Sequence, residues 1–162
     1  MAKRNSQLAL LCLAFMTTLA CKETPETVYA SRSEAEHSGA INRGWVPTLV
    51  PAGSTAIRES HDLDTNEFFG TFHFPSSDVL SLNAGLIELD TTNLTKQPLR
   101  PPALKWWPND LKGILDYQKL SSSGLTLYKS KHDSSTFFAV NWQKGEAFFW
   151  RTGPYQPANS TR

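Results

Sequence analysis

The sequence predicts an α+β fold, an antiparallel β-meander of about four to five strands with short helices packed on one face. The main observation is a series of four strand-like runs near the C-terminus, at residues 114–120, 125–130, 136–142 and 146–151. The segments between them are only a few residues long, and such short connections join only antiparallel neighbours. The helix signals all lie earlier in the chain, so we expect the helices to cover the meander.

A fifth strand is predicted at residues 68–74, where Phe68, Phe72 and Phe74 recur on one face with Gly70 between them. Pro75 ends this run, and the strand can pair with the meander. We expect a single core built from alternating residues of the C-terminal runs: Leu125, Leu127, Phe138, Val140, Phe148 and Trp150.

Three short helices are predicted. Ser33 and Glu36 have the spacing of a capping box, which predicts a helix at 33–38 that stops at Gly39. Ser54 is a suitable cap for a helix at 55–60 with Ile57 facing inward. A third helix begins at Ser76 or Ser77 and runs to about Gly85, with an apolar side made of Val79, Leu80 and Leu82.

The connecting segments are rich in proline. Residues 44–51 are expected to be extended, because the residue before each proline is disfavoured in the helical region. Residues 90–108 hold four prolines and read as a long loop, and loops of that length in small domains are often functional.

The N-terminus has the layout of an export signal. Lys3 and Arg4 precede an apolar run that is too short to span a bilayer and that ends at Ala20-Cys21. We therefore expect a signal peptide at 1–20, a polar tether at 21–30, one α+β domain at 31–152 and a frayed tail at 153–162.

Cys21 is the predicted lipid attachment site. Cys12 lies inside the signal, so Cys21 is the only cysteine of the mature chain, and lipidation would cap a thiol that is a liability in an oxidising compartment. The alternative is ordinary cleavage after Ala20, which releases the protein to the periplasm. Lys22 lacks the acidic side chain of inner-membrane sorting, so we expect an outer-membrane lipoprotein that faces the periplasm.

Composition limits the possible partners. Removal of Lys3 and Arg4 from the 16 basic residues leaves 14, against 15 acidic residues, so the mature chain is close to neutral. A nucleic-acid partner is not expected, because such domains are usually basic. The sequence predicts no cofactor and no metal, and an envelope protein or a wall polymer as partner.

Asp62, Asp64 and Asn66 alternate like the first ligands of a calcium loop. The match then fails, since the loop's glycine and its final glutamate are missing. The interpretation that we favour is a turn in which these side chains accept hydrogen bonds from nearby backbone amides.

Three further residues are candidates for ligand or partner contact. His61 lies beside Glu59, Asp62 and Asp64, and such a cluster supports an alternative function as a hydrolase or metal-dependent enzyme. No recognisable nucleophile motif accompanies it, so a binding or scaffold module is the preferred function and no residue is assigned as catalytic. Trp106 and Trp107 are either a binding anchor on the proline-rich loop or a lid over the sheet.

Several of these motifs occur together in a known family. The Gly44-Trp45-Val46-Pro47 segment, the run from Ile57 to Asn66, the Trp106-Trp107-Pro108 segment and the closing aromatic hairpin resemble an uncharacterised family of small bacterial exported proteins. The resemblance covers nearly the whole mature chain. It implies no activity, because no reaction or ligand is assigned to that family.

Overall fold

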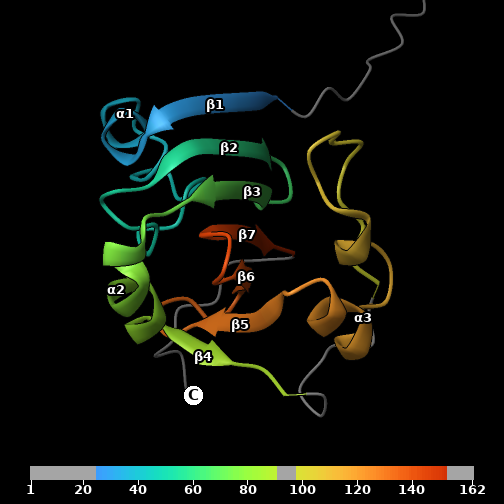
Figure 1. Cartoon of the computed structure of the whole chain (residues 1–162). Coiled ribbons are helices and arrows are strands. Elements are labelled where there is room, and N and C mark those ends of the chain that lie inside the picture. Colours follow the sequence, from blue (N-terminus) through green and yellow to red (C-terminus); the bar gives the residue numbers. More distant parts are fainter. Residues whose placement is uncertain (1–24, 91–97, 153–162) are drawn as a thin grey trace, which may run out of the picture.

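The described part of the chain forms one seven-stranded sheet in which every neighbouring pair is antiparallel. This computed structural model describes residues 25–90 and 98–152. The strand order is β1-β2-β3-β7-β6-β5-β4, so two meanders meet where β3 pairs with β7 (Figure 1). The strands are β1 (Glu26–Ser31), β2 (Thr55–Asp62), β3 (Glu67–His73), β4 (Leu86–Glu88), β5 (Thr126–Ser130), β6 (Thr136–Asn141) and β7 (Glu146–Arg151).

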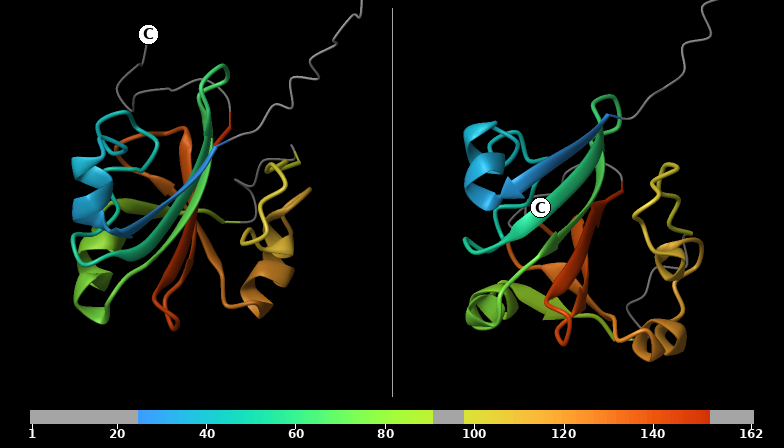
Figure 2. Two further views of the ribbon diagram at one scale, coloured as in Figure 1. Left: turned by 90° about the horizontal axis from the view of Figure 1, so that it is seen from above. Right: turned by 45° about the horizontal axis from the view of Figure 1, so that its top comes forward.

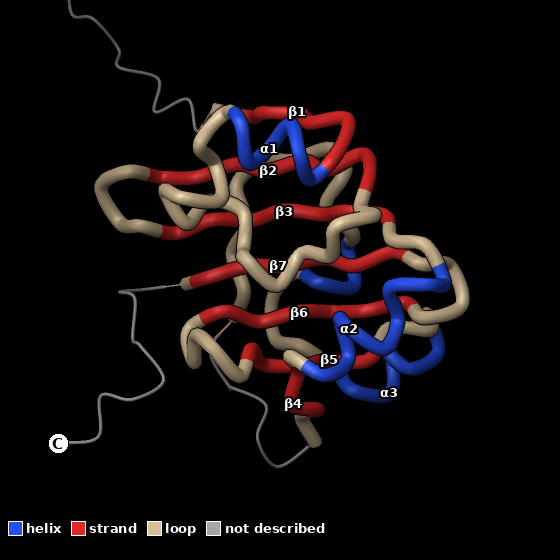
Figure 3. Tube along the Cα trace, turned by 90° about the vertical axis from the view of Figure 1, so that its left-hand side faces the viewer, coloured by secondary structure: helices blue, strands red, loops and turns tan. Residues whose placement is uncertain are grey.

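Short helices cover both faces of this sheet (Figure 2). Helices α1 (Arg32–His37) and α2 (Val79–Ala84), the latter preceded by the 3-10 helix η1 (Ser76–Asp78), lie on one face. Figure 3 views the molecule from that side, and α3 (Tyr117–Ser122) is seen behind the sheet. The 3-10 helix η2 (Asn109–Leu111) lies on the opposite face, together with α3.

Two hydrophobic cores result, one on each side of the sheet. Strand β7 shows the physical reason, since Ala147 and Phe149 enter the first core while Phe148 and Trp150 enter the second. Successive side chains of a strand point to opposite faces, so a continuous apolar run is typical of a strand that is covered on both sides. Helices α1 and α2 contribute Ala35 and Leu82 to the first core, and α3 contributes Leu120 to the second.

The predicted α+β class and the antiparallel arrangement are confirmed. The expected number of strands was too low, and the expectation that the helices pack on one face was wrong. The six predicted core residues are all buried, but they do not form one core: Phe138 and Val140 lie in the first, and Leu125, Leu127, Phe148 and Trp150 lie in the second.

The predicted helix at 55–60 is wrong, because these residues belong to strand β2. The side chains of Ile57, Glu59 and His61, at every second position, are buried, as expected for a strand. Strand β2 pairs with β1 on one side and with β3 on the other. Periodicity cannot separate a helix from a strand over so few residues, whereas two neighbouring strands satisfy the backbone of β2.

The predicted strand at 114–120 is also wrong, since most of it enters α3. Asp116 caps that helix by accepting hydrogen bonds from the amides of Gln118 and Lys119, at 2.9 and 3.1 Å. A side chain that satisfies free amides of the first turn stabilises a helix start. Leu120 is the buried residue of α3.

The N-terminal elements need smaller corrections. The polar tether was predicted to reach residue 30, but strand β1 already begins at Glu26 because β2 offers it a partner. The cap of helix α1 lies two residues earlier than predicted, since Ser31 rather than Ser33 accepts the amide hydrogen bond of Glu34. Residues 44–51 form turns rather than an extended segment.

The strands at 68–74, 125–130, 136–142 and 146–151 are found within one residue of their predicted ends, and the helix that precedes Gly85 is found as η1 and α2. Leu80, which was expected in its apolar side, is 82% exposed. Within the described residues, the helices are all too short or too polar to cross a bilayer.

Candidate functional site

His61 is held in a buried cluster rather than in an open site. Its Nδ1 lies 2.8 Å from Glu59 Oε2, and the Tyr29 hydroxyl donates to Glu59 Oε1 at 3.3 Å. Glu59 is fully buried and His61 is 6% exposed. Burial raises the pKa of the Tyr29 phenol, and the charge of Glu59 adds to that effect. Strand pairing places all three, because β1 and β2 bring Tyr29 opposite Ile57, beside Glu59.

Trp45 covers the imidazole of His61. The two rings are parallel, with centroids 3.7 Å apart and an interplanar angle of 11°. On the indole, the Arg43 guanidinium carbon lies 4.1 Å from the ring centroid, which is a cation–π contact. Arg43, Trp45, His61 and Glu59, here called the Arg43–Glu59 stack, therefore attach the turn segment after α1 to the sheet.

This stack weakens the case for His61 as a catalytic residue. A general base must reach the proton that it removes, and the imidazole is only 6% exposed and is covered on one face by Trp45. The arrangement instead satisfies a buried carboxylate, which is costly to leave without partners.

Asp62 and Asp64 lie in the tight turn that joins β2 to β3. Asp62 Oδ1 accepts from the amides of Asp64 and Thr65, at 2.9 and 3.3 Å, and Asn66 adopts a positive φ of 57°. These contacts are those of the predicted turn. Residues 25–90 and 98–152 contain no group of three His, Cys, Asp or Glu side chains arranged to hold a metal ion.

The two neighbouring tryptophans have different environments. Trp107 is 3% exposed and packs in the second core against Phe69, Phe148 and Trp150. Trp106 is half-buried, and its indole N–H donates to Glu26 Oε1 at 2.8 Å. Trp107 is therefore a core residue and Trp106 covers its edge, so the pair forms a lid on one face of the sheet.

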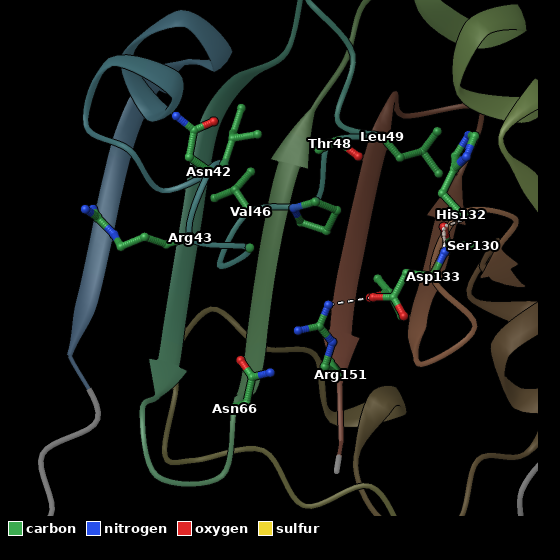
Figure 4. Close-up of a pocket in the computed structure, with 14 residues that line it drawn as sticks. Asn42, Arg43, Val46, Thr48, Leu49, Asn66, Ser130, His132, Asp133 and Arg151 are labelled. Carbon is green, nitrogen blue, oxygen red and sulfur yellow. Dashed lines mark hydrogen bonds and ion pairs between the residues drawn. The ribbon is translucent and has the colours of Figure 1, made fainter. Parts of the chain in front are cut away.

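A cavity lies elsewhere, between the turn segment after α1 and the hairpin that joins β5 to β6 (Figure 4). Its volume is about 450 Å³, which is within the range of small-molecule sites. We call it the loop pocket. It is lined by Ile41, Asn42, Arg43, Gly44, Val46, Pro47, Thr48, Leu49, Asn66, Ser130, His132, Asp133, Thr136 and Arg151.

A buried ion pair forms one side of the loop pocket. Arg151 Nη2 lies 2.5 Å from Asp133 Oδ2, and its guanidinium also lies over the Phe68 ring. Asp133 further accepts from Ser135 and from the Thr136 hydroxyl. Burial by itself would raise the pKa of Asp133, but the hydrogen bonds from Ser135, Thr136 and Arg151 outweigh it and lower the pKa below its ordinary value.

Sequence reasoning missed the loop pocket. Of the residues weighed as ligands from the sequence, Asn66 lines it, whereas His61, Asp62, Asp64, Trp106 and Trp107 do not. Its walls come from segments that are about 90 residues apart in the chain. One signal was present, since Arg151 is a charged residue that directly follows the apolar run Ala147–Trp150 of β7. A charge in such a position needs a partner, and only the fold identifies that partner as Asp133.

Cys21, the predicted signal peptide and the predicted C-terminal tail lie outside the described residues, as do residues 91–97 of the predicted loop.

One family model matches part of the chain. Residues 23–73 are similar to the YbbD head domain, an uncharacterised family. The match covers 51 of 162 residues and spans β1, α1, β2 and β3. It contains the whole Arg43–Glu59 stack and one wall of the loop pocket, while Asp133 and Arg151 lie beyond it. No curated protein and no solved structure matches the chain.

Proposed function

We propose that this protein is a lipid-anchored binding module of the bacterial cell envelope, which holds a small polar ligand or one unit of a wall polymer in the loop pocket. A lipid on Cys21 would anchor it in the outer membrane, facing the periplasm, and the short segment before β1 would hold the domain close to that membrane. The family match gives a YbbD head domain of unknown function, so the proposal goes beyond it.

The observation that carries the proposal is the construction of the loop pocket. Preformed sites combine an apolar lining with a few polar groups in fixed positions. Val46, Pro47 and Leu49 supply the apolar part, while the Arg151–Asp133 pair is held by the hydrogen bonds described above. Ser130 also orders this wall, because its hydroxyl accepts from the amides of His132 and Asp133 at 3.1 and 3.2 Å.

The Arg43–Glu59 stack orders the opposite wall. Arg43 lines the pocket, and its guanidinium donates to the Ser38 carbonyl at 2.7 Å while it lies over Trp45. Two walls that are each held in place reduce the entropy that a ligand must overcome on binding.

The alternative function, a hydrolase centred on His61, finds less support. His61 does not line the loop pocket, and Trp45 covers its ring. No described observation favours this second function.

Binding is tested by titrating the isotope-labelled mature chain with soluble peptidoglycan fragments and following the backbone amide signals by NMR. We expect saturable shifts at the amides of Asn42, Thr48, His132 and Asp133. The amides of α3, on the other face of the sheet, serve as the internal control. Shifts spread evenly over both faces, or no shift at the pocket amides, would refute the proposed site.

The anchor is tested by native mass spectrometry of the protein extracted gently from envelope membranes. A chain that begins at acylated Cys21 supports the lipoprotein assignment, and a bound companion at fixed stoichiometry would identify the partner. An unmodified soluble chain would exclude the lipid anchor and leave the binding module as a periplasmic protein.

A further inference from the structure

We infer that the ligand of the loop pocket is a small organic anion that carries one carboxylate. This inference rests on the proposed function, because it names the ligand class of the same site. It comes from the balance of fixed charges along the walls of the pocket.

Three side chains with a permanent charge line the loop pocket: Arg43, Asp133 and Arg151. Figure 4 shows Arg151 facing Asp133, with Arg43 on the opposite side of the pocket. The opposite charges of Arg151 and Asp133 cancel, so the positive charge of Arg43 is not balanced within the lining. The lining therefore has a net positive charge of one when His132 is neutral.

Asp133 does not offer its charge to a cationic ligand. Its Oδ1 accepts from the amide and the hydroxyl of Ser135, and its Oδ2 accepts from Thr136 and Arg151. These four hydrogen bonds use both oxygens, and they favour the ionised form. The carboxylate thus neutralises Arg151 and stabilises the wall of the pocket.

Arg43, in contrast, has no carboxylate within ion-pair distance among residues 25–90 and 98–152. Its position is nevertheless constrained by Trp45 and by the Ser38 carbonyl. A cation that is fixed at a pocket rim and not neutralised attracts an anion, and a guanidinium matches the geometry of a carboxylate.

The other residues that line the pocket indicate which further groups the ligand carries. The amides of Asn42 and Asn66 and the hydroxyl of Thr48 offer hydrogen bonds, and Val46 and Leu49 are apolar. A volume of about 450 Å³ accommodates one ring with substituents rather than a long chain. A single carboxylate on a hydroxylated or amide-bearing ring fits these features.

The test uses acid and neutral compounds with the same ring. The mature chain is titrated by calorimetry and NMR with N-acetylmuramate against N-acetylglucosamine, and with glucuronate against glucuronamide. We expect each acid to bind about tenfold more tightly than its neutral counterpart, and the preference to fall with added salt.

A matched pair of variants tests whether the preference for acids arises from the charge at the loop pocket. Thr48 is exposed and lines the pocket, so its replacement leaves both cores unchanged. Thr48→Glu places a negative charge at the rim and is expected to weaken binding of the acids about tenfold. Thr48→Gln loses the same hydroxyl and has nearly the shape of Glu but no charge, so it is expected to weaken binding of the acids clearly less than Thr48→Glu does.

The outcomes separate the two claims. If the neutral compounds bind at the pocket as tightly as the acids, or if Thr48→Glu and Thr48→Gln behave alike, the anion inference is overturned and the binding site stands. If none of the four compounds shifts the pocket amides, both the inference and the proposed ligand site are overturned.

Discussion

The indole of Trp45 lies flat on the imidazole of His61, with the ring centroids 3.7 Å apart. Glu59 is fully buried, and its Oε2 lies 2.8 Å from Nδ1 of the same imidazole. The turn segment that forms one wall of the loop pocket is thus attached to the sheet through His61.

Replacement of His61 by alanine is expected to lower the free energy of unfolding by about 3–5 kcal/mol, because it leaves the buried Glu59 carboxylate without its closest partner and removes the support of Trp45. Urea denaturation followed by tryptophan fluorescence measures the loss. Trp45→Phe keeps a ring on His61 and serves as the control, with an expected loss below about 1.5 kcal/mol. Equal losses in the two variants would show that the Glu59 contact contributes nothing.

Substitution of the neighbouring tryptophans is expected to have unequal effects. Trp107→Ala removes a ring that is buried against Phe69, Phe148 and Trp150, so we expect a loss of about 3–5 kcal/mol. Trp106→Ala removes a half-buried ring and one hydrogen bond to Glu26, with an expected loss of about 1 kcal/mol. Thermal unfolding followed by circular dichroism compares the two variants. A larger loss from Trp106→Ala would contradict the assignment of Trp107 to the core.

Gly70 is expected to be intolerant of any side chain. A Cβ at this position would lie 2.0 Å from Cζ of Phe149, in the middle of strand β3. Gly70→Ala therefore forces the ring to move, and we expect a loss of about 3 kcal/mol in unfolding experiments. The double variant Gly70→Ala with Phe149→Leu frees this space, so its loss should be smaller than the sum of the two single losses. Additive losses would mean that the ring is not the obstacle.

The Asp133–Arg151 pair predicts a dependence of stability on pH. Hydrogen bonds lower the pKa of Asp133 in the folded state, so its stabilisation is fully present above the unfolded pKa and is lost as the pH falls through the folded pKa. Asp133→Asn removes this dependence. The difference in unfolding free energy between wild type and variant should therefore shrink below about pH 4. A difference that stays constant down to about pH 2 would contradict the lowered pKa.

Local patterns in the sequence were reliable where one short-range effect decides the structure. The alternation in residues 68–74, the short connections of the C-terminal hairpins and the Asx turn at Asp62 each depend on neighbours within a few residues. The same reasoning failed at residues 55–60 and 114–120. Short apolar runs are compatible with either a helix or a strand, and long-range pairing or a single cap decides between them.

The sequence by itself determined the class of the fold and most of its strands, because β-strand alternation and turn chemistry are encoded within each segment. It also predicts an export signal that ends before Cys21, since such signals act as linear motifs. Only the tertiary structure decided that both faces of the sheet are covered, that His61 lies beneath Trp45, and that Arg43 and Arg151 line one pocket. These relationships join residues that are far apart in the chain, and they arise when strand pairing and the burial of apolar surface bring those segments together.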